Sequence, residues 1–431
     1  MNTHPYRLVI VVRADPVICG HSGEARNLAE AALVRGFTDV RIVTWPIERL
    51  EAAGLPLKPL ETVMPYSPGI TVERPDPVGD ARVPDGRYLA GLTGRLVELF
   101  TDGVPTVAMS LYLSPHTFAV TDAVRIARST GLPVDVTTVA EAVGSDVTNV
   151  VRGCIEADRF GAAAQVLSTY LANDVCLAVS EYTRDLVLEC AREVDARHGT
   201  RYASRCAQRI RISYPAIDTR AYTDLDPADV DAALAARGLE RDGYVFFLSR
   251  LAAAKGVDDL IDGFARSGTA ATTRLVIAGR GPEAAELRAY AAASPAADRI
   301  TFLDDVDDDE KPYLMAGSAA FVLPSKPRPE FVETFGIALT EAMLAGAGGV
   351  ITTLTGGIGE AVGDHATIVG VEDPDAIAAA LDDLVLRSGP DDRTQRREAA
   401  RSYALQFDRA HVLDGILGAV WASRGPTVIG A

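Results

Sequence analysis

The sequence predicts an α/β protein made of two Rossmann-like domains, each a doubly wound parallel sheet with helices on both faces. Short apolar runs such as residues 8–12 alternate with longer helical stretches, as expected for buried parallel strands joined by crossover helices. The alternation stops in a proline turn near residue 215 and restarts at residue 244. A chain of 431 residues fits two or three domains.

Composition excludes several classes of partner. The net charge is −17 and the isoelectric point is near 4.8, so nucleic acid and anionic membranes would repel the protein at long range. The five cysteines have no C-x-x-C spacing, which favours reduced thiols. The first strand begins almost at once, and no apolar run could span a bilayer. We therefore expect a cytoplasmic protein.

The first half opens with a strand, a glycine-containing turn and a helix. The turn, residues 20–23, reads GHSG and could offer backbone amides to a phosphate or sugar. It is not a GxGxxG fingerprint, and a tight turn in which Ser22 caps the helix is an equal alternative. Residues 65–86 are rich in proline and without periodicity, which suggests an acceptor-side loop or lid.

Two polar residues follow candidate strands further on. His116 comes after a strand at residues 106–112, and Glu141 comes after one at residues 134–139. Ligands of open α/β sheets bind outside the carboxyl ends of strands, so both are candidate site residues. A lone histidine is at least as well explained as a loop residue with its hydrogen bonds satisfied.

The second half places cations at the end of its first strand. Arg250 and Lys255 follow residues 244–249, and Gly256 opens a helix. Two cations beside a helix start suit a diphosphate. The acidic run at residues 304–310 directly precedes a helix, so we interpret it as capping and solvating acids rather than a metal site.

The segment 324–346, PSKPRPEFVETFGIALTEAMLAG, carries two glutamates eight positions apart. On one helix, Glu333 and Glu341 would lie about 12 Å apart along the axis and roughly 80° apart around it. Both could then grip one elongated, polyhydroxylated anion. Alternatively, Glu333 is an acid favoured by the helix dipole and Glu341 reaches solvent.

These residues resemble the Glu-x7-Glu signature of the family-four retaining glycosyltransferases, which have the GT-B fold and use nucleotide-sugar donors. The resemblance implies two Rossmann-like domains that face each other across a cleft. Arg250, Lys255 and Gly256 are similar to the family's Gly-Arg-Leu…Lys-Gly motif. Ser249 stands where glycine is usual, and Gly359 where proline is usual.

The resemblance assigns roles to residues of both halves. Glu333 contacts the transferred sugar, Glu341 contacts the ribose, and Arg250 and Lys255 stabilise the diphosphate without a metal or other cofactor. Further donor contacts fall on Phe335, Gly336, Ile337, Ser22 and Gly23, and acceptor-side positions on His21, His116 and Glu141. The family often has a histidine near residue 140, where this chain has Ala140 and Glu141.

The resulting hypothesis is a metal-independent, retaining hexosyltransferase with a small-molecule acceptor, as in natural-product biosynthesis. Residues 1–215 form the acceptor domain, 216–407 the donor domain, and 408–431 a helix that returns to the first domain. The alternatives are a nucleotide-sugar epimerase or phosphorylase on the same fold, and a non-catalytic sugar-nucleotide sensor. A nicotinamide-dependent oxidoreductase is disfavoured because no GxGxxG with a downstream ribose acid occurs.

Overall fold

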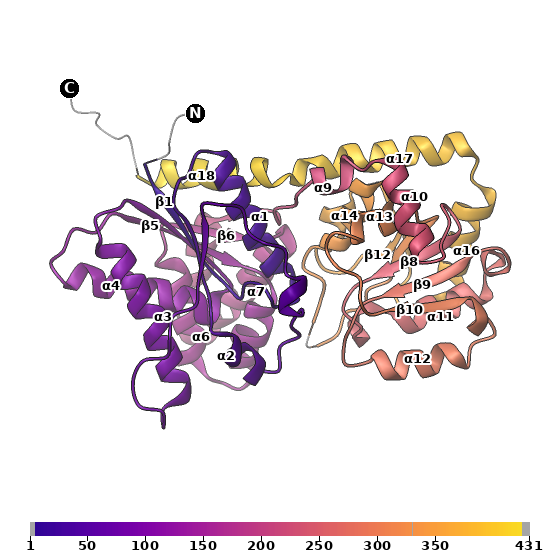
Figure 1. The fold of residues 1–431 in the computed structure, drawn as a ribbon. Coiled ribbons are helices and arrows are strands. Elements are labelled where there is room, and N and C mark those ends of the chain that lie inside the picture. Colours follow the sequence, from indigo (N-terminus) through magenta and orange to yellow (C-terminus); the bar gives the residue numbers. More distant parts are fainter. Residues whose placement is uncertain (1–4, 330, 425–431) are drawn as a thin grey trace. The chain divides into compact units, whose positions relative to one another are not determined.

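The computed structural model describes residues 5–329 and 331–424. The chain divides into two compact units, Met1–Ala216 with Arg409–Ala431, and Ile217–Asp408. These limits differ from the predicted domain limits by one residue. Each unit contains one sheet whose strands pair in parallel (Figure 1). The predicted fold class, two doubly wound parallel-sheet domains, is confirmed.

The sheet of the first unit has the strand order β3-β2-β1-β4-β5-β6-β7. Its strands are β1 (Arg7–Val11), β2 (Val40–Val43), β3 (Ile70–Glu73), β4 (Thr106–Leu111), β5 (Val136–Ala142), β6 (Val175–Ala178) and β7 (Ile210–Ile212). Its helices are α1 (Gly20–Val34), α2 (Ile47–Ala52), α3 (Pro84–Thr101), α4 (Phe118–Ser129), α5 (Gly153–Glu156), α6 (Phe160–Leu171), α7 (Glu181–His198), α8 (Tyr202–Arg209) and α18 (Arg409–Arg424).

Strand β1 shows how the two faces of this sheet are buried. Successive side chains of a strand point to opposite faces. Leu8 and Ile10 pack in one cluster with residues of α1 and α18, whereas Val9 and Val11 pack in another with residues of α3 and α4. The last helix of the chain, yellow in Figure 1, is therefore part of the first unit's core.

The sheet of the second unit has the strand order β10-β9-β8-β11-β12-β13. Its strands are β8 (Tyr244–Leu248), β9 (Arg274–Ala278), β10 (Ile300–Leu303), β11 (Ala320–Leu323), β12 (Val350–Thr353) and β13 (Thr367–Val369). Its helices are α9 (Arg220–Thr223), α10 (Pro227–Ala236), α11 (Val257–Arg266), α12 (Ala284–Ala292), α13 (Lys311–Ala316), α14 (Ile337–Ala345), α15 (Ile358–Val362), α16 (Pro374–Asp382) and α17 (Pro390–Ala404). Across the described parts of both units, we find no helix with the length and apolarity that a membrane span requires.

Two expectations about the first unit need correction. The stretch 65–86 is not without regular structure, because it contains β3, which pairs with β2 at the edge of the sheet. Four residues between prolines are too few to show a strand period. Strand β5 extends beyond residue 139, so Glu141 lies inside the strand and not after it. The small residues Ala140 and Ala142 let the strand continue in the core.

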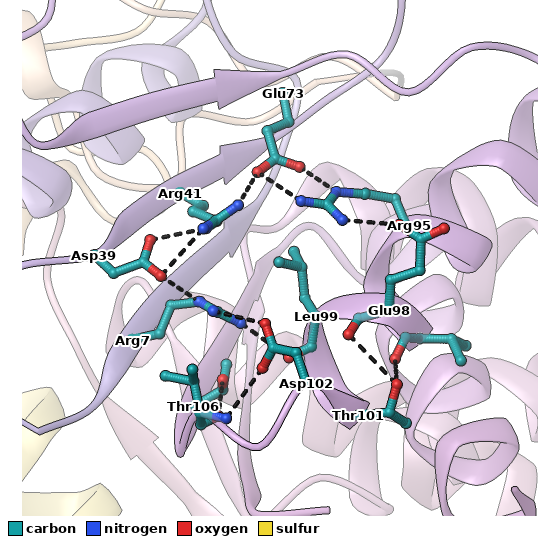
Figure 2. Close-up of polar contacts among 12 residues, drawn as sticks. Arg7, Asp39, Arg41, Glu73, Arg95, Glu98, Leu99, Thr101, Asp102 and Thr106 are labelled. Atoms are coloured by element: carbon teal, nitrogen blue, oxygen red, sulfur yellow. Dashed lines mark hydrogen bonds and ion pairs between the residues drawn. The ribbon is translucent and has the colours of Figure 1, made fainter. Parts of the chain in front are cut away.

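A network of ion pairs runs from the amino ends of β1 and β2 to the carboxyl end of β3 and to α3 (Figure 2). It joins Arg7, Asp39, Arg41, Glu73, Arg95, Glu98 and Asp102. The buried Arg7 donates to Asp39 at 2.6 Å and to Asp102 at 2.8 Å. Burial alone would raise the pKa of Asp39, but hydrogen bonds from Arg41 and Arg7 hold it below its usual value. The charged groups of this network are therefore paired within the first unit.

Candidate active site

Within the segment 324–346, the described residues before Gly336 lie in a loop, and helix α14 follows. Gly336 caps the start of the helix with a left-handed φ of 105°, and Gly346 ends it with φ 79°. Glu333 therefore precedes the helix, whereas Glu341 lies within it. The arrangement with both glutamates on one helix is wrong, because left-handed Gly336 interrupts helical geometry between them.

Glu333 is held by Lys255. The Lys255 ammonium donates to Oε2 of Glu333, and the two side chains are only 10% and 13% exposed. The same ammonium lies 4.6 Å from the ring centroid of Phe331. In the part of the chain that the structure describes, nothing donates to Oε1 of Glu333. The lysine predicted for the diphosphate and the glutamate predicted for the sugar thus form one contact, with a carboxylate oxygen left open.

Glu341 is held in a similar way by two other residues. Lys311 Nζ donates to its Oε1 at 2.7 Å, and the hydroxyl of Tyr222 donates to the same oxygen at 2.6 Å. From residues 5–329 and 331–424, no hydrogen bond reaches Oε2. Each glutamate therefore presents a single oxygen to a ligand.

The loops that carry these groups are locked together. Gly256 has φ 65°, and a Cβ there would lie 2.1 Å from the carbonyl oxygen of Pro324. Lys326 is buried, and its ammonium pairs with Asp258 at 2.8 Å and with Asp259 at 2.9 Å. These contacts join the start of α11 to the loop before Glu333, so that Lys255 and Glu333 meet.

A glycine pair supports Glu333 from the other side. The N–H of Gly357 donates to the carbonyl of Glu333 at 2.9 Å. A Cβ on Gly356 would lie 1.9 Å from the same carbonyl oxygen, and one on Gly357 would lie 2.0 Å from that of Thr334. The turn before α15 can approach this closely only without side chains.

The other predicted donor residues of the second unit differ in accessibility. Arg250 is exposed and forms no ion pair with any residue that the structure describes, so its guanidinium is free to bind an anion. Phe335 is buried with its ring against Phe407, at 5.0 Å between centroids, so its side chain belongs to the core. Gly336 and Ile337 stand at the start of α14, where unpaired amides can face an anion.

The predicted turn of the first unit is the first turn of α1. The helix begins at Gly20 with Cys19 as its N-cap residue and no side-chain cap. Ser22 therefore does not cap it; its Oγ is buried and lacks a hydrogen-bond partner among the described residues. His21 is half-buried, and burial together with the charge of Arg13 lowers its pKa to about 4. Gly23 is exposed.

His116 uses both of its ring nitrogens inside the first unit. Nε2 accepts from the indole N–H of Trp45 at 3.0 Å, which leaves Nδ1 to donate to the carbonyl of Leu111 at 2.8 Å. Burial lowers its pKa to about 3. This is the arrangement expected of a satisfied neutral histidine.

Glu141 belongs to a group of buried acids. Neither carboxyl oxygen of Glu141 has a hydrogen-bond partner in the described chain. Burial raises its pKa well above the usual value, and the nearby Glu24 and Asp146 add to the effect. Burial also raises the pKa of Glu24 to about 7 and that of Asp146 to about 6. Asp146 is satisfied by the backbone amides of Leu113 and Gly144, whereas Glu141 is not.

The acidic run at residues 304–310 has structural partners. Arg237 pairs with Asp305 and Glu310, and Asp307 accepts from the amides of Asp309 and Glu310 just before α13. The residues with assigned positions include no group of three or more His, Cys, Asp or Glu side chains suited to a metal ion.

Sequence reasoning missed Lys311 and Tyr222, the partners of Glu341. The partners lie 30 and 119 positions from Glu341, so no local motif joins them. One signal was present for Lys311: a cation directly after an acidic run, at a helix start where the dipole favours anions.

Comparison with known proteins finds a family model that matches most of the second unit. Residues 232–403 match the family model described as glycosyl transferases group 1. Over 223 residues the chain is 32% identical to a GDP-mannose-dependent alpha-(1-6)-phosphatidylinositol monomannoside mannosyltransferase of Mycobacterium tuberculosis, covering 49% of this chain and 53% of the relative. Over 105 residues it is 36% identical to O-antigen chain mannosyltransferase B of Escherichia coli, covering 24% of this chain and 25% of the relative. The chain thus spans about half or less of the length of these curated relatives.

A solved structure supports the fold of the whole chain. Anabaena HepE, in complex with UDP and glucose, superposes with a TM-score of 0.68 over 97% of this chain and 100% of HepE, at 17% identity. At that identity the likeness concerns the fold. Residues 232–403 of the second unit are thus similar to the group 1 glycosyl transferases, and the chain has the GT-B fold.

Proposed function

We propose that the protein is a retaining glycosyltransferase that moves a hexose from a nucleotide-sugar donor to a small-molecule acceptor. The observation that carries this is the Lys255–Glu333 pair at the start of α14, with Glu341 on the same helix, inside the region matched by the family model. Two open carboxylate oxygens suit hydroxyls, and the helix start with Arg250 suits a diphosphate.

In this proposal Arg250 and Lys255 stabilise the charge that grows on the leaving diphosphate, which is the role of preorganised donors. Glu333 orients the transferred sugar through its open oxygen, and Glu341 binds the ribose. The acceptor attacks from the face that the diphosphate leaves, and a leaving phosphate oxygen takes the acceptor's proton. The anomeric configuration is then retained.

The donor we propose first is GDP-mannose, because the named relatives are mannosyltransferases. Thermal shift with GDP, UDP, ADP and TDP and their sugars tests this, since a bound ligand stabilises by mass action. Stabilisation by GDP and GDP-mannose above the others is the expected result. No shift with any nucleotide would contradict the proposed function itself.

The reaction class is tested by product analysis. Transfer to an added acceptor with the donor's anomeric configuration supports the proposal. An epimerised donor or a sugar 1-phosphate would instead indicate the epimerase or the phosphorylase, and binding without turnover would indicate a sensor.

Full activity after EDTA treatment is expected, because Arg250 and Lys255 supply the positive charge.

For the acceptor we propose a small metabolite and a cytoplasmic reaction, on the ground of the net charge of −17. A two-arm assay offers a pool of hydroxylated small molecules and anionic lipid vesicles. Transfer in the vesicle arm alone would contradict the small-molecule assignment.

A further inference from the structure

Lysine is rare in this chain, and every lysine is paired with an acid. Of the 42 lysine and arginine residues, four are lysines. The pairs are Lys58–Asp15, Lys255–Glu333, Lys311–Glu341, and Lys326 with Asp258 and Asp259. A lysine ammonium is a compact charge that can occupy one carboxylate oxygen, whereas the planar guanidinium of arginine tends to take both.

Lys311 stands where local preferences disfavour it. It is the first residue of α13, and the helix dipole disfavours a cation at a helix start. Its side chain is only 17% exposed, and that of Glu341 is 12% exposed. The contact between them therefore offsets both an unfavourable helix position and partial desolvation.

Tyr222 adds a second hold on the same oxygen. It is buried at α9, and the Lys311 ammonium lies 5.5 Å from its ring centroid. Burial and the negative charge of Glu341 raise the pKa of Tyr222, so the phenol stays protonated and donates. Lys311 and Tyr222 thus converge on Oε1 of Glu341 from two different helices.

Two donors on one oxygen fix the rotation of a carboxylate. The backbone of Glu341 is fixed by α14, and its Oε1 is held at 2.6 Å and 2.7 Å. Only Oε2 remains for a ligand, and its direction is set before the ligand arrives. Preorganisation of this kind reduces the side-chain ordering that binding requires.

We propose that Lys311 and Tyr222 are positioning residues that make Oε2 of Glu341 the acceptor for a single ribose hydroxyl of the donor. The inference rests on the proposed function and deepens it, because it names what fixes recognition of the ribose. It also makes donor binding, and not the chemical step, depend on Lys311.

The test measures dissociation constants by calorimetry for the nucleoside diphosphate that stabilises the wild type most, and for its 2′-deoxy and 3′-deoxy forms. In the wild type, one deoxy form should bind about 10- to 100-fold more weakly, the scale of losing a hydrogen bond to a charged group, and the other nearly normally.

Lys311→Met and Tyr222→Phe should weaken binding of the ribonucleotide by about tenfold and several-fold, respectively. Both variants should also reduce the difference in affinity between the ribonucleotide and the weaker deoxy form. Steady-state kcat should stay within about twofold. Arg266→Met, which removes an exposed ion pair of the same unit, should change neither quantity.

Several results would overturn the proposal. If both variants melt normally and keep the wild-type affinity and discrimination, the contacts with Glu341 are structural only. If both deoxy forms lose affinity equally in the wild type, Glu341 does not accept from a single hydroxyl. If the wild type binds no nucleoside diphosphate at all, the proposed function fails and this inference fails with it.

Discussion

Glu333 and Glu341 share one design at the residue scale. Each carboxylate has one oxygen fixed by a lysine and one open. A mostly buried carboxylate without a cation would be strongly destabilising. Each lysine therefore offsets the cost of burying its glutamate and also fixes the orientation of the carboxylate. Arg250 lacks such a partner within the described residues, as expected of a group reserved for an anion.

Lys255→Ala should lower kcat by about two to three orders of magnitude, the scale of losing one donor to developing charge. It also leaves Glu333 without its cation. Lys255→Arg should rescue only part of the rate, because its fork takes both oxygens of Glu333. Steady-state kinetics check this, with Arg387→Ala, an exposed ion pair of the same unit, as control. A wild-type rate in Lys255→Ala would indicate that the diphosphate binds elsewhere in the protein.

Glu24→Gln should remove one contribution to the pH dependence of the first unit's stability. Burial raises the pKa of Glu24 to about 7 from 4.5, so the folded state holds a proton that the unfolded chain releases. The contribution of Glu24 to the free energy of unfolding is fully present below pH 4.5 and is lost as the pH rises to 7. The loss amounts to about 3 kcal/mol. Buried Glu141 and Asp146 act in the same direction.

Thermal melts at pH 5, 6, 7 and 8 measure this effect. The wild type should lose melting temperature across the range, and Glu24→Gln should be flatter and more stable at pH 8. The exposed Glu51, changed to Gln, serves as the matched control. Identical pH profiles for the wild type and Glu24→Gln would rule out the assignment.

Sequence alone could suggest single candidate site residues but not their contacts. Arg250, Lys255, Glu333 and Glu341 stand in short local motifs, so a resemblance could suggest them. The partners of the two glutamates lie 30 to 119 positions away and follow only from the packing of different elements. Ser22 was considered as a cap because its type fits, but the helix begins two residues earlier.

At the element scale, the turn at Gly356 and Gly357 fixes the loop of Glu333. Gly357→Ala should lower kcat at least tenfold, because a Cβ 2.0 Å from the carbonyl of Thr334 must displace that loop. Gly359→Ala, in the helix that follows this turn, is the matched control, since its Cβ would meet only Leu354 at 3.4 Å. As an alanine in α15 it should stabilise the unit by about 0.5–1 kcal/mol. Equal activity in the two variants would contradict the role of the turn.

Elements with clear periodicity could be predicted, and those without it could not. Strand β1 could be predicted because it is a continuous buried apolar run. Strand β3 could not, because it is a four-residue edge strand between prolines. Strand β5 was predicted too short, because a glutamate is a strong signal for a strand end. That glutamate is buried without a partner, a local conflict of the kind expected at a functional position.

At the scale of the whole molecule, the repeated strand–helix alternation was enough to predict two parallel-sheet units. The place where the chain changes unit was predicted at a proline turn near residue 215, which resembles the hinge of the family. The return of α18 to the first unit was expected only through resemblance. The apolar pattern of a helix indicates that one face is buried but does not indicate which sheet that face covers.

The central claim is that the two glutamates divide recognition of the donor. In the proposed function, Glu341 makes the same contact in ground and transition states, so Glu341→Ala should weaken nucleoside-diphosphate binding and raise KM with little change in kcat. In the same proposal, Glu333 contacts the sugar that is transferred, so Glu333→Ala should mainly lower kcat and keep nucleotide affinity.

The most direct test is therefore a paired measurement of steady-state kinetics and nucleoside-diphosphate affinity on Glu333→Ala and Glu341→Ala, each first shown to melt cooperatively. The account predicts a kcat defect in the first variant and a binding defect in the second. Loss of nucleotide affinity in Glu333→Ala with normal affinity in Glu341→Ala, or changes of no more than a few-fold in both, would contradict it.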